Sequence, residues 1–240
     1  AVGGAGGGRG GGSESGVARK EQLPRGRCAN AAIRAWRRLR GASIGHIQRA
    51  GCLGQSEVVT TAHNRCIRDL LRDIQTHTKK SSGLKMLTLE SEQTIGKLWE
   101  QKECGSICQK QELWEAAKET EMNIPLQRQE DEGPAVEQDY EERFWRRRLD
   151  GIALDEEGKK CYPIEFKRKR DQRLSYEEEA TKVAERQYES LLAGLQAVGE
   201  QRGWEIKQIV FVGGTCGSVG EDVFNQNMKL LEVVESRWST

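Results

Sequence analysis

The sequence lacks a long apolar run. No segment of the 240 residues approaches the roughly 20 consecutive apolar residues that a membrane-spanning helix requires, which predicts a soluble protein without a membrane partner. An apolar h-region near the first residue is also lacking, so we do not expect a secretory leader. The seven cysteines fall at irregular spacing, which fits a reducing compartment better than a disulfide framework. We therefore expect free thiols and an intracellular location.

An excess of charge of either sign is also lacking. The formal net charge is +1, so the overall composition does not indicate a nucleic-acid binder. The charge is uneven along the chain, because residues 140–175 contain eleven Lys and Arg against eight Asp and Glu, a net of +3. Any positive potential should therefore lie around that segment.

A complete set of zinc ligands is missing as well. Four residues of metal-ligating types lie early in the chain: His46, Cys52, His63 and Cys66. No CxxC motif accompanies them, so we do not expect a zinc site. A helix that begins near residue 60 explains the last two more simply. Its apolar stripe would consist of Ile67, Leu70, Leu71 and Ile74.

Composition divides the chain into three parts. Residues 1–28 begin with AVGGAGGGRGGGSESG, whose low complexity predicts a disordered tail. Residues 29–126 have helical patterns and predict a helical region. The segment QRQEDEGP at 127–134 is polar and ends in Gly-Pro, which marks a loop and a domain boundary. A second domain should therefore cover residues 135–236.

The order of elements in this second domain predicts an α/β fold. A helix over 135–147 comes first, followed by a β-hairpin and a long helix over 175–200 that Ser175 and Glu178 open as a capping box. A β-branched strand over 206–212 and a helix that begins near Ser218 complete the domain. The predicted core is thus αββαβα with a mixed sheet.

The hairpin carries the charged residues of greatest chemical interest. Its sequence, WRRRLDGIALDEEGKKCYPIEFKRKR, predicts strands over 149–154 and 161–168, joined by a DEEG turn at 155–158. Side chains alternate along a strand, so Asp150 should share a face with Ile152 and Leu154. Glu165 and Lys167 should share one face of the next strand. Two carboxylates and an ammonium group can therefore converge.

Two converging carboxylates are suited to holding a hard cation. Mg²⁺ in proteins is often held by one or two carboxylates and keeps several waters. One such water can become the nucleophile in phosphodiester hydrolysis, while the metal offsets charge on the phosphate. Asp150 and Glu165 are the predicted ligands for Mg²⁺ or Mn²⁺, and Lys167 is the predicted water-positioning group.

The pattern of Asp150 followed by Glu165-Phe166-Lys167 resembles the PD-(D/E)xK, or restriction-endonuclease-like, nuclease superfamily. Leu149 replaces the proline that is frequent in that family. The αββαβα order is the layout that the superfamily uses for its core. The resemblance implies a metal-dependent endonuclease acting on DNA. It also implies a further acid on the helix before the hairpin, for which Glu141 is the first choice.

A second resemblance concerns the origin of the chain. The hairpin, together with QIVFVGGTCGSVGEDVFNQNMKLL, is similar to nuclease-like domains of retroelement-derived proteins in algae and other eukaryotes. The upstream IGHIQRAGC and AHNRCIRDLL resemble the region after the reverse transcriptase of non-LTR retrotransposons. No polymerase motif is present. The resemblance implies that 29–126 is a post-polymerase remnant and that the protein is nuclear.

Several residues around the hairpin are candidates for contact with DNA. Basic side chains there would bind backbone phosphates without reading sequence, and the candidates are Arg148, Arg168, Lys169 and Arg170. Tyr188 continues the apolar stripe of the long helix, so it should be core. Gln187 lies at the edge of that stripe and alone should face the metal pocket or the DNA backbone.

Other interpretations of the same residues stay open. The hairpin could be an exposed structural element with salt-bridged charges. The domain could be a non-catalytic nucleic-acid-binding remnant of the nuclease fold. It could also be a protein-interaction module that docks a partner through helix 175–200. The sequence does not decide between DNA and RNA or give the oligomeric state.

Overall fold

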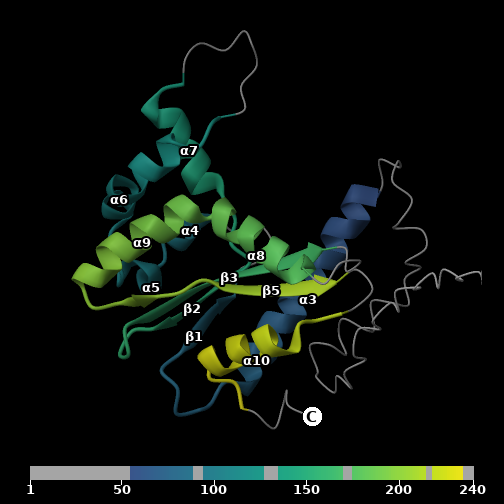
Figure 1. The fold of residues 1–240 in the computed structure, drawn as a ribbon. Helices are drawn as coiled ribbons and strands as arrows, with labels where there is room; N and C mark the ends of the chain where they lie inside the picture. The colour runs from purple at the N-terminus through teal and green to yellow at the C-terminus, as the bar shows by residue number, and fades with distance from the viewer. Residues whose placement is uncertain (1–54, 89–93, 127–134, 170–174, 215–217, 235–240) are drawn as a thin grey trace, which may run out of the picture.

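The computed structural model describes residues 55–88, 94–126, 135–169, 175–214 and 218–234 (Figure 1). Within these ranges the chain is an α/β protein with five strands and eight helices. None of these helices has the length and apolar character that crossing a membrane demands. Several predicted features lie outside the described residues: the tail, the loop at 127–134, His46, Cys52 and Arg170.

A mixed five-stranded sheet forms the centre of the molecule. Its strands are β1 (Lys85–Thr88), β2 (Gly151–Asp155), β3 (Lys160–Lys169), β4 (Glu205–Ile206) and β5 (Ile209–Gly214). The first three form an antiparallel meander in the order β1-β2-β3. Both β4 and β5 then pair in parallel with β3, one after the other along its length. The mixed sheet is therefore confirmed.

The β2–β3 hairpin has the turn that the sequence predicts. The Asp155 carboxylate accepts a hydrogen bond of 2.8 Å from the Gly158 amide, which closes the turn on itself. A Cβ on Gly158 would lie 2.3 Å from an Asp155 oxygen, so the close approach needs glycine. Strand β2 begins at Gly151, which leaves Asp150 just before the strand rather than inside it.

Strand β1 lies within residues 29–126, the segment for which the sequence predicts a helical region. Its four residues pair with β2 from Thr88 opposite Gly151 to Lys85 opposite Leu154. Such a short strand gives little periodic signal in a sequence, and its pairing partner lies more than 60 residues away. The sheet therefore includes a strand from the segment before the predicted boundary.

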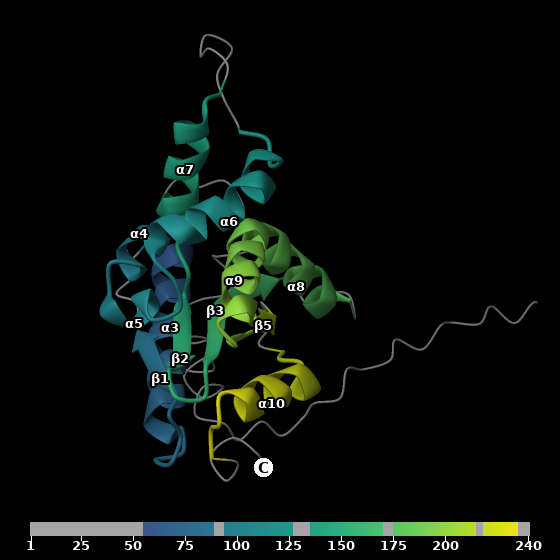
Figure 2. The same ribbon diagram turned by 90° about the vertical axis from the view of Figure 1, so that its left-hand side faces the viewer.

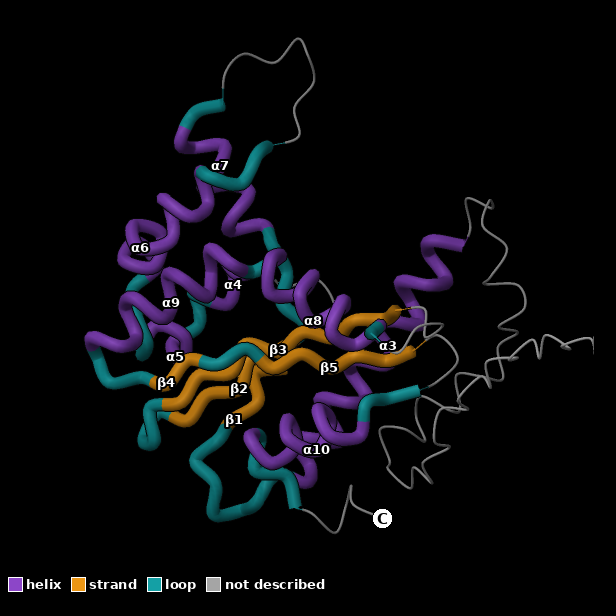
Figure 3. Tube along the Cα trace, viewed as in Figure 1, coloured by secondary structure: helices purple, strands orange, loops and turns teal. Residues whose placement is uncertain are grey.

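Helices cover both faces of the sheet (Figures 1 and 2). One face carries α4 (Ile95–Leu98), α5 (Lys102–Gly105), α6 (Lys110–Met122), α7 (Glu137–Arg146), α8 (Tyr176–Gln187) and α9 (Glu189–Gln201). The other carries α3 (Gln55–His77) and α10 (Glu221–Leu230). Figure 3 shows the strands enclosed between these two layers of helix. Burial on both sides favours the apolar, β-branched composition of the central strands.

Side chains alternate along β2, so they pack into two hydrophobic cores, one on each face of the sheet. Ile152 and Leu154 pack with the helices of the first layer, and Ala153 packs with α3 and α10. This confirms the predicted shared face for Ile152 and Leu154, whereas Asp150 lies just before the strand. The predicted stripe of α3 is also confirmed, because Ile67, Leu70, Leu71 and Ile74 are all buried against the sheet.

The predicted long helix over 175–200 is wrong, because the structure divides it into α8 and α9. Tyr188 ends the first helix and begins the second, with φ of −116° and ψ of 16°. The predicted capping box does not form at the start of α8, since the Ser175 hydroxyl donates to the Glu179 carboxylate instead. The apolar repeat runs through the break, so the sequence pattern gave no sign of it.

Candidate active site

The two predicted carboxylates lie opposite each other at one end of the hairpin. Gly151 pairs with Ile164, so the register continued by one residue sets Asp150 opposite Glu165. Directly opposed residues of an antiparallel pair point to the same face. The Asp150 Oδ2 atom accepts a hydrogen bond of 2.7 Å from the Phe166 amide, which ties the carboxylate to β3.

Lys167 and Gln187 complete a chain of polar contacts around Glu165. The Lys167 ammonium donates to Glu165 Oε1 at 2.6 Å and to Gln187 Oε1 at 2.5 Å. Gln187 lies at the end of α8, and the parallel pairing of β3 with β5 holds Lys167 on the face that α8 covers. The structure thus brings together Asp150, Glu165, Lys167 and Gln187, as the sequence predicted.

Tyr188 takes part in the same site, which corrects the prediction that only Gln187 faces it. Its ring is fully buried in the core, as predicted. Its hydroxyl, however, donates to the Arg148 carbonyl and accepts a hydrogen bond of 2.9 Å from Gln187. Adjacent residues on a continuous helix diverge by about 100°. The break at Tyr188 removes that constraint and lets both side chains reach the site.

Burial and crowding of charge change the protonation of the pair. Burial, and after it the charge of the nearby Glu165 carboxylate, raise the pKa of Asp150 to about 7, against the lowering effects of the Phe166 amide and Lys167. Burial also raises the pKa of Glu165, although the charge of Lys167 opposes this. One ammonium group therefore balances two carboxylates incompletely, and a proton or a cation would relieve the excess negative charge.

The oxygens of this pair fit a hard cation. Glu165 Oε2 is buried and has no hydrogen-bond partner among the described residues. No group of three or more His, Cys, Asp and Glu side chains within the described ranges is arranged to hold a metal. Two carboxylates are nevertheless enough for Mg²⁺ or Mn²⁺ when waters and phosphate oxygens supply the other ligands. Asp150 and Glu165 are the residues that could hold such an ion.

The structure places Glu141 away from the carboxylate pair. Its side chain accepts a hydrogen bond of 3.1 Å from the Trp145 indole. It lines a hollow of about 400 Å³ between α4 and α7 that includes neither Asp150 nor Glu165. The carboxylate therefore points along α7 rather than toward the hairpin, and the structure gives it no contact with the proposed metal ligands.

The side chains predicted to contact DNA differ in their exposure and in their ion pairs. Arg148 is exposed and directly precedes the segment that leads to Asp150. Arg168 is half-buried, and its charge contributes to the lowered pKa of His63. Lys169 forms an ion pair of 2.9 Å with Glu179, which neutralises part of its charge. Of the three, Arg148 is therefore the exposed side chain, and Lys169 is already paired.

His63 is the site residue that the sequence analysis missed. Its Nε2 atom lies 3.9 Å from Asp150 Oδ1, and its ring packs on Phe166 with centroids 5.7 Å apart. Burial lowers the pKa of His63, and the charges of Lys167 and Arg168 lower it further, which favours the neutral imidazole. Only the packing of α3 across the end of the sheet brings this histidine to the hairpin.

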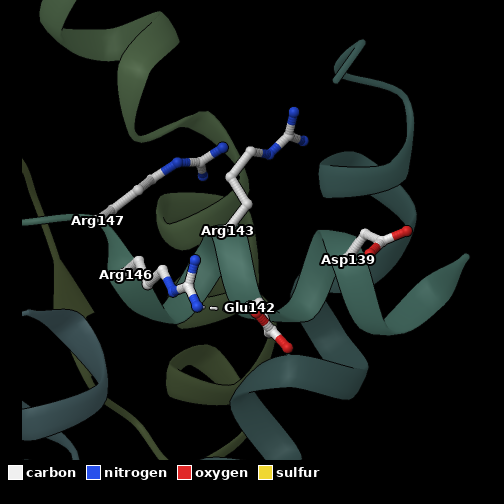
Figure 4. Close-up of a pocket in the computed structure, with 5 residues that line it drawn as sticks. All are labelled: Asp139, Glu142, Arg143, Arg146 and Arg147. Carbon is white, nitrogen blue, oxygen red and sulfur yellow. Dashed lines mark ion pairs between the residues drawn. The ribbon is translucent and has the colours of Figure 1, made fainter. Parts of the chain in front are cut away.

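A second buried carboxylate lies close to the site and is fully paired. Glu121 is fully buried near the end of α6, where Arg143 and Arg147 of the α7 region both bind it at 2.6 Å. The Ser190 hydroxyl of α9 donates to the same carboxylate at 2.5 Å. Figure 4 shows the two arginines beside Arg146, which pairs with Glu142, around a hollow of about 390 Å³.

Comparison of the chain with models of protein families, with curated proteins and with solved structures finds no match in any of the three.

Proposed function

We propose that the protein is a Mg²⁺- or Mn²⁺-dependent endonuclease that hydrolyses phosphodiester bonds in DNA. The observation that carries this proposal is the opposition of Asp150 and Glu165 beside the Lys167 ammonium, with an unpartnered carboxylate oxygen buried between strand and helix. This combination supplies ligands for a cation and a group that can orient a water. Burying such charged groups also costs free energy, which a functional role would explain.

The layout of the sheet supports the same proposal. An antiparallel meander β1-β2-β3 followed by a helical crossover and a strand parallel to β3 is compatible with a restriction-endonuclease-like core. In this proposal the Asp precedes the second strand and the Glu and Lys lie on the third. The origin in a retroelement and the nuclear location follow from the sequence resemblance alone, and they stay predictions.

The residues have separate roles in the proposed reaction. Asp150 and Glu165 would hold the cation, which when bound supplies an activated water and offsets charge on the phosphate. Lys167 would orient the attacking water, while Gln187 fixes the ammonium by accepting its second hydrogen bond. Neutral His63, beside Asp150, adds no positive charge that would oppose the cation. Arg148 and Arg168 would bind backbone phosphates.

The test is cleavage of supercoiled and linear DNA by the purified chain with Mg²⁺, Mn²⁺ or EDTA. We expect nicking or cutting that needs the cation and is lost in Asp150→Asn. Glu156→Gln, in the exposed turn of the same hairpin, is the matched control and should cut at the parent rate. Cleavage that survives Asp150→Asn would refute the assigned site. DNA binding without any cleavage would indicate a non-catalytic remnant, and cleavage of RNA alone would contradict the proposed substrate.

A further inference from the structure

The paired carboxylate of Glu121 contacts the two chain segments that set the geometry of the candidate site. Arg147 lies three residues before Asp150, and its guanidinium binds Glu121 at 2.6 and 2.7 Å. Ser190 lies two residues after Tyr188, and its hydroxyl binds the same carboxylate. Arg147 also donates to Ser190 at 2.6 Å, which closes a ring of three side chains.

The same two segments meet again at the site itself. The Arg148 carbonyl accepts a hydrogen bond from the Tyr188 hydroxyl, and Asp150 lies two residues after Arg148. The Arg147 carbonyl accepts a hydrogen bond of 2.7 Å from the Ile95 amide, so both sides of the segment are fixed. Residues 147–150 form no strand or helix, and these contacts determine their path.

A buried ionic network of this kind is not explained by stability alone. Taking charges out of water costs free energy, and apolar residues of similar volume often serve as well or better. Glu121, Arg147 and Ser190 come from α6, from the end of α7 and from α9, so their ring fixes three elements relative to one another. The placement of Asp150 against Tyr188 and Glu165 depends on the relative position of these three elements.

We infer that Glu121 is a positioning residue for the candidate site: through Arg147 and Ser190 it holds the Asp150 carboxylate in its place opposite Glu165. A role for Glu121 in catalysis rests on the proposed function, whereas its role in positioning Asp150 does not. Partners that orient metal ligands from outside the coordination sphere commonly change metal affinity or activity about 10- to 100-fold when they are removed.

The placement of Asp150 has a direct reporter, because its carboxylate accepts the Phe166 amide proton. Hydrogen exchange of that amide, followed by NMR on the full chain, measures how well the carboxylate stays in place. The variant Asp150→Ala lacks the acceptor of this hydrogen bond, so it gives the exchange rate of an unprotected Phe166 amide. We expect Glu121→Gln to raise the rate toward that limit and Glu121→Asp to have an intermediate effect. Affinity for Mn²⁺, measured by calorimetry, should fall about tenfold or more in Glu121→Gln.

A loss of stability alone could loosen the site, so the control must destabilise the same helix. Leu113→Ala removes a fully buried side chain from α6, two turns from Glu121, without touching the network. It should lower the melting temperature while leaving the Phe166 amide protected and Mn²⁺ affinity near that of the parent. The inference is overturned if Glu121→Gln leaves the amide protected, or if Leu113→Ala exposes it equally.

The proposed function fails separately from this inference. If Asp150→Asn and Glu165→Gln bind Mn²⁺ as the parent does, the metal site is wrong, and the exchange rate of the Phe166 amide still decides whether Glu121 positions Asp150. If those two variants lose Mn²⁺ while Glu121→Gln keeps both the cation and the amide protection, the metal site stands and the positioning role is refuted.

Discussion

Glu121 of α6 and the Asp150–Glu165 pair of the hairpin differ in how their charge is balanced, although Glu121 and Glu165 are both buried and Asp150 is half-buried. Two guanidinium groups and a hydroxyl contact the single Glu121 carboxylate. The pair has one ammonium group, which binds Glu165, and the Phe166 amide, which binds Asp150, and Glu165 Oε2 has no hydrogen-bond partner among the described residues. Glu121 is therefore balanced within the protein, and the pair is not.

This difference separates a structural carboxylate from one that is suited to bind something. A buried charge with complete partners has no capacity for a further ligand, and removing it harms the fold. Burying a carboxylate with an unpartnered oxygen costs free energy, and binding of a cation to that oxygen would offset this cost. The pKa of Asp150 is raised first by burial and then by the charge of Glu165, and protonation is the alternative way to relieve both effects.

The largest expected effect is on cleavage. Asp150→Asn and Glu165→Gln should each reduce metal-dependent DNA cleavage to background, because the cation loses one of only two protein ligands. The melting temperature of the metal-free protein should stay the same or rise, since each substitution removes one of two neighbouring carboxylates that share a single ammonium group. Cleavage assays and thermal unfolding on the same preparations measure both quantities. A clear fall in melting temperature would mean that this pair is structural, like Glu121.

The opposite pattern is expected for Glu121. Glu121→Gln should lower the free energy of unfolding by about 3–5 kcal/mol, because it removes the fully buried carboxylate that the half-buried Arg143 and Arg147 both bind. Chemical denaturation in urea, with the slope compared with that of the parent, gives this value. A loss below about 1 kcal/mol, as for an exposed ion pair, would contradict the comparison.

A smaller effect should follow from removing the ammonium group that binds Glu165 and Gln187. Lys167→Met should reduce the cleavage rate by roughly 10²-fold while DNA affinity stays nearly unchanged, because the group acts on the water and not on the backbone. Cleavage kinetics and DNA titration in the presence of Ca²⁺ separate the two. Equal losses of rate and affinity would indicate an ordinary basic contact.

The smallest effect concerns pH. The pKa of Asp150 is raised to about 7 in the folded state, so its protonation favours folding. This contribution is fully present below the ordinary pKa of an aspartate and is lost as the pH rises through about 7. Without a divalent cation, the melting temperature should therefore fall between about pH 5 and about pH 8, and less so in Asp150→Asn. Equal pH profiles for both proteins would show that another group titrates.

The sequence predicted the hairpin and its charged residues because the relevant signals are local. Alternation along two adjacent strands and a turn with Asp first and Gly fourth are short-range patterns, and they predicted that Asp150, Glu165 and Lys167 converge. The side-chain alternation of β2 followed from the same pattern. The placement of Glu141 depends instead on the rotation of α7 about its axis, which packing decides.

Other parts of the site depend on contacts between distant segments. His63 reaches Asp150 only because α3 packs across the sheet, and Glu121 meets Arg147 only because α6 lies against α7. A lone histidine and a glutamate in an amphipathic helix give no signal of these partners. The break at Tyr188 was also hidden, because the apolar repeat continues through it and only the backbone angles interrupt the helix.

By itself, the sequence determined the α/β class, the hairpin, and the convergence of two acids with a lysine. These features follow from periodicity and turn chemistry, which act over a few residues. Only the tertiary structure decided that Tyr188 and Gln187 both reach the site, that β1 joins the sheet, and that Glu121 is fully balanced while Glu165 is not. The reason is physical: the balance of a buried charge depends on which remote groups surround it, and no local pattern encodes that neighbourhood.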